Sequence, residues 1–130
     1  MKTLDVGRRL VELCRRGENR RAIEELYADD AVSVEPMEDP TGTFPRESVG
    51  KETILKGADW WTENHEVHDG RVDGPYPFED RFVVFMTVDV TAKGGPMAGQ
   101  RMKLEEACHY TVKDGKIARA EFFWDASGCQ

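Results

Sequence analysis

The hydrophobic period of this chain changes from that of a helix to that of a strand near His65. Before His65, apolar residues recur at offsets of three and four, which is typical of amphipathic helices. After His65, apolar and polar residues alternate, which is typical of half-buried strands. Helices followed by strands, with no second change, predict one α+β domain over residues 1–130.

Three helices are predicted in the first half. Thr3 is expected to cap the first helix and Gly17 to end it, while Asn19 caps the second and either Ser48 or Gly50 opens the third. The expected buried residues are Val6, Leu10, Leu13 and Cys14 in the first helix, Ala22, Ile23, Leu26 and Tyr27 in the second, and Ile54, Leu55, Ala58 and Trp61 in the third.

One short strand is predicted between the second and third helices. Asp29-Asp30 closes the second helix, residues 32–35 alternate as a strand, and residues 37–48 form a loop that rims a pocket. The later strands are expected over residues 65–73, 81–93, 100–112 and 116–124. Gly74-Pro75 is expected to end the first of these.

The charge and the cysteine content exclude several classes of protein. A net charge of −7 disfavours nucleic acid and anionic membranes as partners. No apolar run is long enough to span a membrane or to act as a signal peptide. Three cysteines without paired spacing predict the reducing cytoplasm, with Cys14 and Cys108 as buried hydrophobes. Without metal-ligand spacing or a glycine-rich phosphate loop, no metal or nucleotide cofactor is expected.

The last hairpin has two possible registers. A two-residue loop of Asp114-Gly115 pairs Val112 with Ile117, whereas a three-residue loop with a bulge at Gly115 pairs Val112 with Lys116. We favour the bulged register because it leaves one face mainly apolar. The residues that it places on this inner face are Leu104, Glu106, Cys108, Tyr110, Ala118, Ala120, Phe122 and Trp124.

The strand over residues 81–93 shows the same alternation. Its even-numbered residues from Phe82 to Val90 are apolar, so the odd-numbered residues face outward, including an Asp89 that pairs with an arginine such as Arg101 or Arg119. The outer face still carries Phe85, Phe123 and Ile117. An outer face of this kind predicts a partner, most simply a second copy of the chain.

The order of these elements resembles a known family. Three segments carry the resemblance: residues 26–32 (LYADDAV), 110–117 (YTVKDGKI) and 121–124 (EFFW). Together they are similar to the cone-shaped fold of nuclear transport factor 2-like proteins, and within it to the SnoaL-like branch. The resemblance covers nearly the whole chain. It implies helices packed on a strongly curved antiparallel sheet around an internal pocket, and it is compatible with several enzymes and with binders.

Ketosteroid isomerase belongs to the same fold. Its catalytic aspartate lies in a Glu-Asp-Pro segment, which residues 38–40 resemble, as do residues 34–36. Where that enzyme has a first-helix tyrosine this chain is aliphatic near Val11, and Cys108 stands where it has an aspartate. Steroid isomerase chemistry is therefore not implied.

Two carboxylates are the leading catalytic candidates. Glu106 is expected to point into the apolar cavity, where burial raises a carboxyl pKa and prepares it for acid–base work. A structural carboxylate bonded to a hydroxyl or histidine is the alternative. Glu35 lies at a strand end where the family places its base, and Asp39 competes for that role from a loop. His68 could shuttle protons or orient Glu106.

The remaining candidates are expected to bind ligand. They are Tyr110, Cys108, Phe122, Trp124 and Trp60, and core packing explains the aromatic ones equally well. The resemblance implies a cofactor-free acid–base catalyst for isomerisation, cyclisation, dehydration or hydrolysis of a small apolar substrate. A non-catalytic ligand-binding module or a dimeric scaffold is the alternative.

Overall fold

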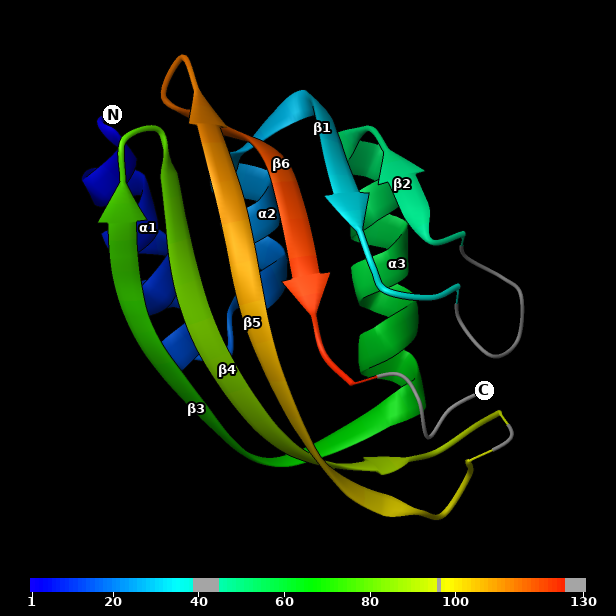
Figure 1. Ribbon diagram of the computed structural model, residues 1–130. Helices are drawn as coiled ribbons and strands as arrows, with labels where there is room; N and C mark the ends of the chain where they lie inside the picture. Colours follow the sequence, from blue (N-terminus) through cyan, green and yellow to red (C-terminus); the bar gives the residue numbers. More distant parts are fainter. Residues whose placement is uncertain (39–44, 96, 126–130) are drawn as a thin grey trace.

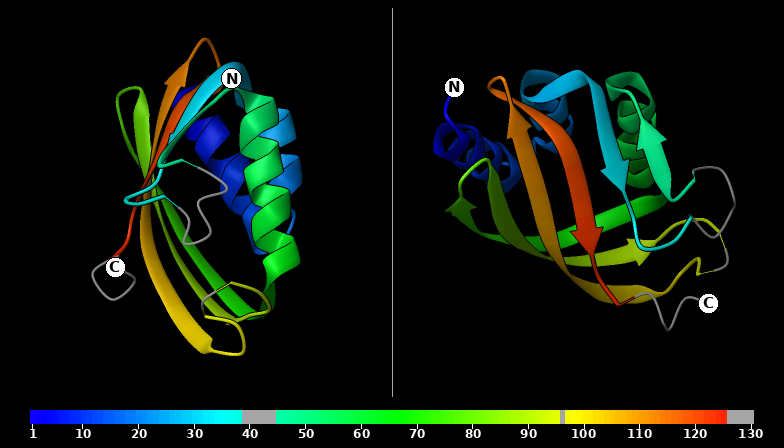
Figure 2. Two further views of the ribbon diagram at one scale, coloured as in Figure 1. Left: turned by 90° about the vertical axis from the view of Figure 1, so that its right-hand side faces the viewer. Right: turned by 45° about the horizontal axis from the view of Figure 1, so that its top comes forward.

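Among residues 1–38, 45–95 and 97–125, which this computed structural model describes, one curved sheet carries all three helices on a single face (Figures 1 and 2). The helices are α1 Thr3–Arg15, α2 Asn19–Leu26 and α3 Lys51–Asn64. The strands are β1 Tyr27–Val34, β2 Glu47–Val49, β3 His65–Phe78, β4 Arg81–Ala92, β5 Arg101–Lys113 and β6 Lys116–Phe123. The expected α+β class is confirmed.

The strand order of the sheet is β2-β1-β6-β5-β4-β3, and the sheet is not closed. Strands β1 and β6 are parallel neighbours, whereas every other adjacent pair is antiparallel. The sheet is therefore mixed rather than wholly antiparallel. This difference matters for the site because two parallel neighbours end at the same edge.

The long strands give the molecule its cone shape. Strands β3, β4 and β5 have 14, 12 and 13 residues, whereas β1 and β6 have 8 each. Figure 1 shows the long strands continuing past the ends of β1 and β6 and curving toward the end of α3.

Several predicted boundaries are wrong. Helix α2 ends at Leu26, so Tyr27 and Asp29-Asp30 belong to β1 instead of closing the helix. Strand β2 lies in a segment that was expected to be loop. Strand β3 continues through Gly74-Pro75 to Phe78, with an irregular register between Asp73 and Tyr76. A bulge absorbs the proline that was expected to end the strand.

The predicted glycine positions are confirmed, but the predicted side-chain caps are not. Gly17 has a φ of 74° just after α1, and Gly50, with a φ of 95°, precedes α3. Thr3 and Asn19 are instead the first residues of their helices. Lys2 and Glu18 occupy the two cap positions and make no side-chain cap hydrogen bond there.

The last hairpin combines features of both predicted registers. Asp114 and Gly115 form a two-residue loop with positive φ at both positions, so Val112 pairs with Ile117 and the favoured pairing with Lys116 is wrong. The register then shifts next to Ala118, leaving one extra residue in β6.

That shift restores the predicted faces. Beyond it, Tyr110 pairs with Ala120 and Cys108 with Phe122, two residues further along β6 than the favoured register implied, so these residues share the face that it assigned them. Ile117 was expected on the outer face, but it is fully buried, because the bulge lies after it instead of before it.

The core fills the space between the helices and the concave face. Fully buried side chains include Val6, Leu13, Leu26, Phe82, Val84, Val90, Cys108 and Ile117. The inner face predicted for β4 is confirmed by Phe82, Val84 and Val90. Asp89 faces outward and is paired with Arg101 at 2.9 Å, one of its two predicted partners. Cys108 is buried as expected, whereas Cys14 is half-buried.

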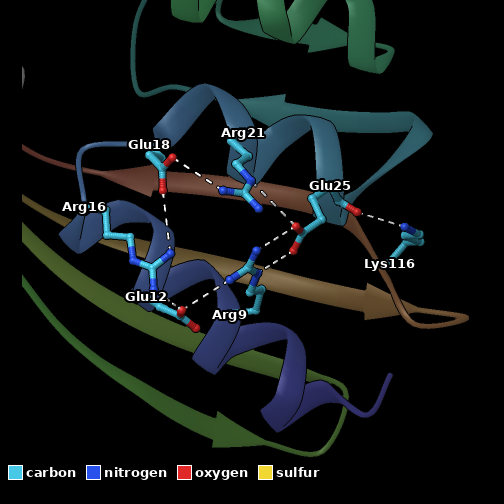
Figure 3. Close-up of polar contacts among 7 residues, drawn as sticks. All are labelled: Arg9, Glu12, Arg16, Glu18, Arg21, Glu25 and Lys116. Atoms are coloured by element: carbon cyan, nitrogen blue, oxygen red, sulfur yellow. Dashed lines mark hydrogen bonds and ion pairs between the residues drawn. The ribbon is translucent and has the colours of Figure 1, made fainter.

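An ion-pair network joins α1 to α2 (Figure 3). The Arg9 guanidinium donates to both Glu25 carboxylate oxygens, at 2.6 and 2.9 Å, and Arg9 also pairs with Glu12. Lys116 Nζ donates to the Glu25 carbonyl oxygen at 2.9 Å, which ties the start of β6 to the end of α2. This network thus ties α1 to α2 near the start of β6, at the other end of that strand from Trp124.

Candidate functional site

The ends of β1 and β6 place two polar side chains next to each other. Glu35 follows the last residue of β1, and Trp124 follows the last residue of the parallel neighbour β6. Trp124 Nε1 donates a hydrogen bond to Glu35 Oε2 at 2.9 Å. The Glu35 amide also donates to the Arg46 carbonyl oxygen at 2.8 Å, so both backbone and side chain are held.

Glu106 lies on the concave face of β5. It is two residues from Cys108 and four from Tyr110, both fully buried, and it pairs with Met86 across β4. Because alternate residues of a strand share a face, Glu106 points to the same side as these core residues. Glu106 itself is half-buried. The expected placement on the concave wall is confirmed.

The pKa values of both carboxyl groups are raised. Burial, followed by the nearby charge of Glu35, raises the pKa of Glu106 from 4.5 to about 7, although a hydrogen bond with Cys108 lowers it. Burial also raises the pKa of Glu35, and the hydrogen bond from Trp124 opposes this rise. Glu35 therefore keeps the negative charge more readily, and Glu106 holds a proton close to neutral pH.

Aromatic rings back this carboxylate pair. Tyr110 stacks on Phe82 with ring centroids 4.9 Å apart, and Phe122 meets the Tyr110 ring edge-on at 6.2 Å. Tyr110 is only 2% exposed, so it supports the concave wall from behind. Phe122 and Trp124 are half-buried.

Two of the predicted site residues, His68 and Trp60, do not join this group. His68 is exposed at an irregularity of β3, and its Nε2 lies 2.7 Å from Thr91 Oγ1, so it does not orient Glu106. The Trp60 ring packs edge-on against His65 at 6.2 Å. Asp39 lies outside the described residues.

Two partners were missed by sequence reasoning. The Trp124–Glu35 hydrogen bond depends on β1 lying beside β6, and no local pattern reports strand order. Cys14 of α1 is the other: its pKa rises to about 12 through burial and through the nearby Glu106 charge. Its position in the helix stripe indicated burial, but not which strand it would face.

Two surface hollows lie away from Glu35. One of about 360 Å³ lies between α1 and Gly74-Pro75, with Arg8 and Arg15 at its edge. The second, of about 320 Å³, is lined by Phe85, Ala107 and Phe123 of the convex face and also by Met86 and Glu106. Neither hollow is an internal pocket that contains Glu35, so the internal pocket expected from the sequence stays a prediction.

Two further searches cover the described part of the chain. Residues 1–38, 45–95 and 97–125 hold no group of three or more His, Cys, Asp and Glu side chains suited to a metal ion. No helix within these same residues has the length and apolar character needed to span a membrane.

Comparisons with known proteins agree on the family. The family model described as SnoaL-like domain matches residues 1–124. A Mesorhizobium loti protein, provisionally named a SnoaL-like polyketide cyclase, is 40% identical, with a TM-score of 0.85 over 95% of this chain and 99% of that chain. Comparison with curated proteins finds no match.

More distant structures share the fold alone. A Xanthomonas campestris protein of unknown function with a cystatin-like fold is 16% identical, with a TM-score of 0.74 over 95% of this chain and 91% of that chain. A Bacillus subtilis protein, provisionally named an isomerase, is 16% identical, with a TM-score of 0.73 over 98% of this chain and 91% of that chain.

The raised pKa of Glu106 predicts a pH-dependent stability. Between pH 4.5 and about 7 the folded chain binds more protons than the unfolded chain, so the free energy of unfolding falls as the pH rises through this range. The fall attributable to Glu106 is about 3 kcal/mol at most. Glu106→Gln abolishes this contribution, so the variant gains stability over the wild type above pH 7.

Denaturant unfolding at pH 5 and pH 8 measures the effect. Glu105→Gln is the matched control, because Glu105 is the adjacent residue of β5 and is exposed. It should change with pH as the wild type does. A Glu106→Gln variant that also follows the wild type at both pH values would contradict the assigned burial of this carboxylate.

Proposed function

We propose that this chain, which belongs to the SnoaL-like domain family, is a cofactor-free acid–base enzyme for a small, largely apolar substrate. The observation that carries the proposal is the coupled pair of Glu106 and Glu35 on one apolar wall. Two carboxyls whose environments separate their proton affinities can supply an acid and a base at the same pH.

The surroundings of the two carboxyls suggest their roles. Glu35 is the base, because the indole N–H of Trp124 stabilises its anionic form. It accepts a proton from an acidic C–H of the substrate or from water. Glu106 is the acid, because at neutral pH it holds the proton that a developing oxyanion or leaving group requires. Over a full cycle Glu35 gives up the proton that it accepted and Glu106 regains the proton that it donated, so both groups return to their starting states without a cofactor.

The side chains around the pair suggest an apolar substrate. Phe122 and Trp124 are half-buried beside the carboxylates and offer aromatic surface, while Cys108 and Tyr110 form the wall behind. Isomerisation and cyclisation, the reactions in the names of two structural relatives, both require proton transfer. Dehydration and hydrolysis would use the same two carboxyl groups. We expect the reaction to take place in the cytoplasm, as the sequence predicts.

The alternative function is binding without turnover. A binder needs the apolar wall but not two carboxyls that exchange protons with a ligand. A dimeric scaffold would need neither. Proton exchange therefore separates the enzyme from both alternatives.

Deuterium exchange tests the proposal before the substrate is known. A panel of small apolar ketones and esters is incubated with the protein in D₂O, and NMR records exchange of the acidic C–H together with shifts of the Trp124 indole signal. The wild type should exchange at least one compound that shifts this signal. Glu35→Gln and Glu106→Gln should each lose about 100-fold or more of that rate.

Glu105→Gln controls for the substitution itself, since it removes a carboxylate from the same strand on the opposite face. It should retain the wild-type rate. Compounds that shift the Trp124 signal but exchange no faster than in buffer would favour the binder. Exchange that survives in Glu106→Gln would remove Glu106 from the mechanism.

We also propose that two copies pair through the convex face of the sheet. Phe85, Ala107 and Phe123 form a row across β4, β5 and β6, and the two phenylalanines are about half exposed. No described helix covers this face (Figure 2). Beside the row, Arg119 pairs with Glu121 of the same chain, which reduces the charge that a second copy would face there.

Sedimentation of the Phe123→Asp variant tests this pairing. A carboxylate in the middle of the aromatic row should convert a dimeric wild type to monomer at micromolar concentration. Val67→Asp is the control, because Val67 is 53% exposed, as against 56% for Phe123, but lies outside the row. A wild type that sediments as a monomer at all concentrations would refute the proposed dimer.

A further inference from the structure

The hollow of about 360 Å³ between α1 and β3 is lined by none of the proposed acid–base residues. Helix α1 packs beside β3, which is the last strand in the order of the sheet (Figure 2). Val11 of α1, only 3% exposed, and Gly74-Pro75 of β3 form the apolar part of the lining. A volume of this size is typical of sites for small molecules.

Two contacts between α1 and β3 hold the hollow in shape. A methyl group added at Gly7 would lie 2.9 Å from Pro75 Cβ, so the helix and the strand are in close contact at this point. Further along the helix, Arg15 donates from Nε and Nη2 to the Val72 carbonyl oxygen, at 3.1 and 2.9 Å. Gly7 and Arg15 are about 12 Å apart along the helix axis. The hollow is therefore formed by packed elements and not by a loop.

The charged side chains of the hollow are mainly cationic. Three arginines and one glutamate line it, which gives a local charge of +2 in a chain whose net charge is −7. The glutamate, Glu12, already pairs with Arg16 at 2.7 Å and with Arg9 at 3.3 Å (Figure 3). Within the part of the chain that the structure describes, Arg8 and Arg15 have no carboxylate partner. These two guanidinium groups therefore keep their charge available to a ligand.

The two guanidinium groups also keep hydrogen-bond donors available. Each guanidinium has five N–H groups; Arg15 uses two of them on β3, and Arg8 uses none among the described residues. Planar guanidinium groups match the paired oxygens of a carboxylate or phosphate. Asp73 of β3 does not compete for them, because it pairs with Arg71 at 2.9 Å and lies opposite Phe85 of the convex face.

We propose that the hollow between α1 and β3 binds a small organic anion, in which a carboxylate or phosphate group is joined to a compact apolar body. The anionic group accepts hydrogen bonds from Arg8 and Arg15, and the apolar body lies against Val11 and Pro75. An exposed ion pair contributes little by itself because water and salt screen it, so the apolar contact selects organic over inorganic anions. This site is independent of the proposed acid–base pair, and either proposal can fail without the other.

Titration with three probes tests the site, with ¹H–¹⁵N NMR of the Gly74 amide and of the Arg15 Nε–H group as the readout. The probes are phenyl phosphate, which has both parts, inorganic phosphate, which lacks the ring, and phenol, which lacks the anion. Phenyl phosphate should shift both signals with a Kd of about 1 mM or lower. It should bind about 10-fold more tightly than inorganic phosphate, because its ring buries apolar surface. Phenol should shift neither signal.

Arg8→Gln tests the role of the hollow in this binding. Arg8 has no partner among the described residues, so the variant should fold as the wild type does and weaken phenyl phosphate binding about 10-fold. Lys56→Gln is the matched control, because Lys56 is an exposed cation of α3 that also has no ion pair in the described part of the chain. It should retain the wild-type affinity. Equal weakening in both variants would show that overall charge, and not the hollow, attracts the anion.

The Trp124 indole signal separates this site from the acid–base pair. It should stay unchanged while phenyl phosphate shifts the signals of Gly74 and Arg15. A probe that shifts Trp124 and not these two binds beside Glu35, and the anion site is then wrong although the acid–base proposal stands. The anion site is also wrong if phenyl phosphate causes no saturable shift up to about 10 mM, or if inorganic phosphate binds equally well.

Discussion

Two carboxylates on one apolar wall limit the charge that this site can carry. Burial raises the pKa of both Glu106 and Glu35, which come from segments far apart in sequence, and the charge of Glu35 raises the pKa of Glu106 further. The chain compensates with a single N–H from Trp124 on one carboxylate and a thiol on the other. This unequal support lets Glu35 keep its charge more readily, while a pKa of about 7 leaves Glu106 partly protonated at neutral pH.

The sheet topology makes that arrangement possible. Because β1 and β6 are parallel and short, both stop at one edge, and the residues that follow them meet there. The longer β5 continues beyond that edge and presents Glu106 on its concave face. The helices, joined by ion pairs around Arg9 and Glu25, close the opposite side. The fold is shared with proteins of low identity, so function depends on these side chains and not on the cone.

Alternation in the sequence predicted the faces of the long strands, and with them the placement of Glu106, because one polar residue among buried neighbours fixes a register. The alternation could not predict the conformation of the last hairpin, where the turn residues and the inner face favour different registers. Asp114-Gly115 favours a two-residue loop, and the inner face requires an extra residue, so the chain forms that loop and places the bulge at Ala118. His68 was misplaced for a similar reason, since an irregularity of β3 breaks the alternation there. The Trp124–Glu35 contact depends on strand order, which no local pattern carries.

The coupling between the two carboxyls is tested most directly by titrating Glu106 in the wild type and in Glu35→Gln, with ¹³C NMR of the side-chain carboxyl carbon. The account predicts a pKa of about 7 for Glu106 in the wild type, and a lower value once the charge of Glu35 is removed. A Glu106 that titrates near 4.5 in both proteins would show that the carboxylate is solvated and independent of Glu35. In that case the site would have no acid at neutral pH.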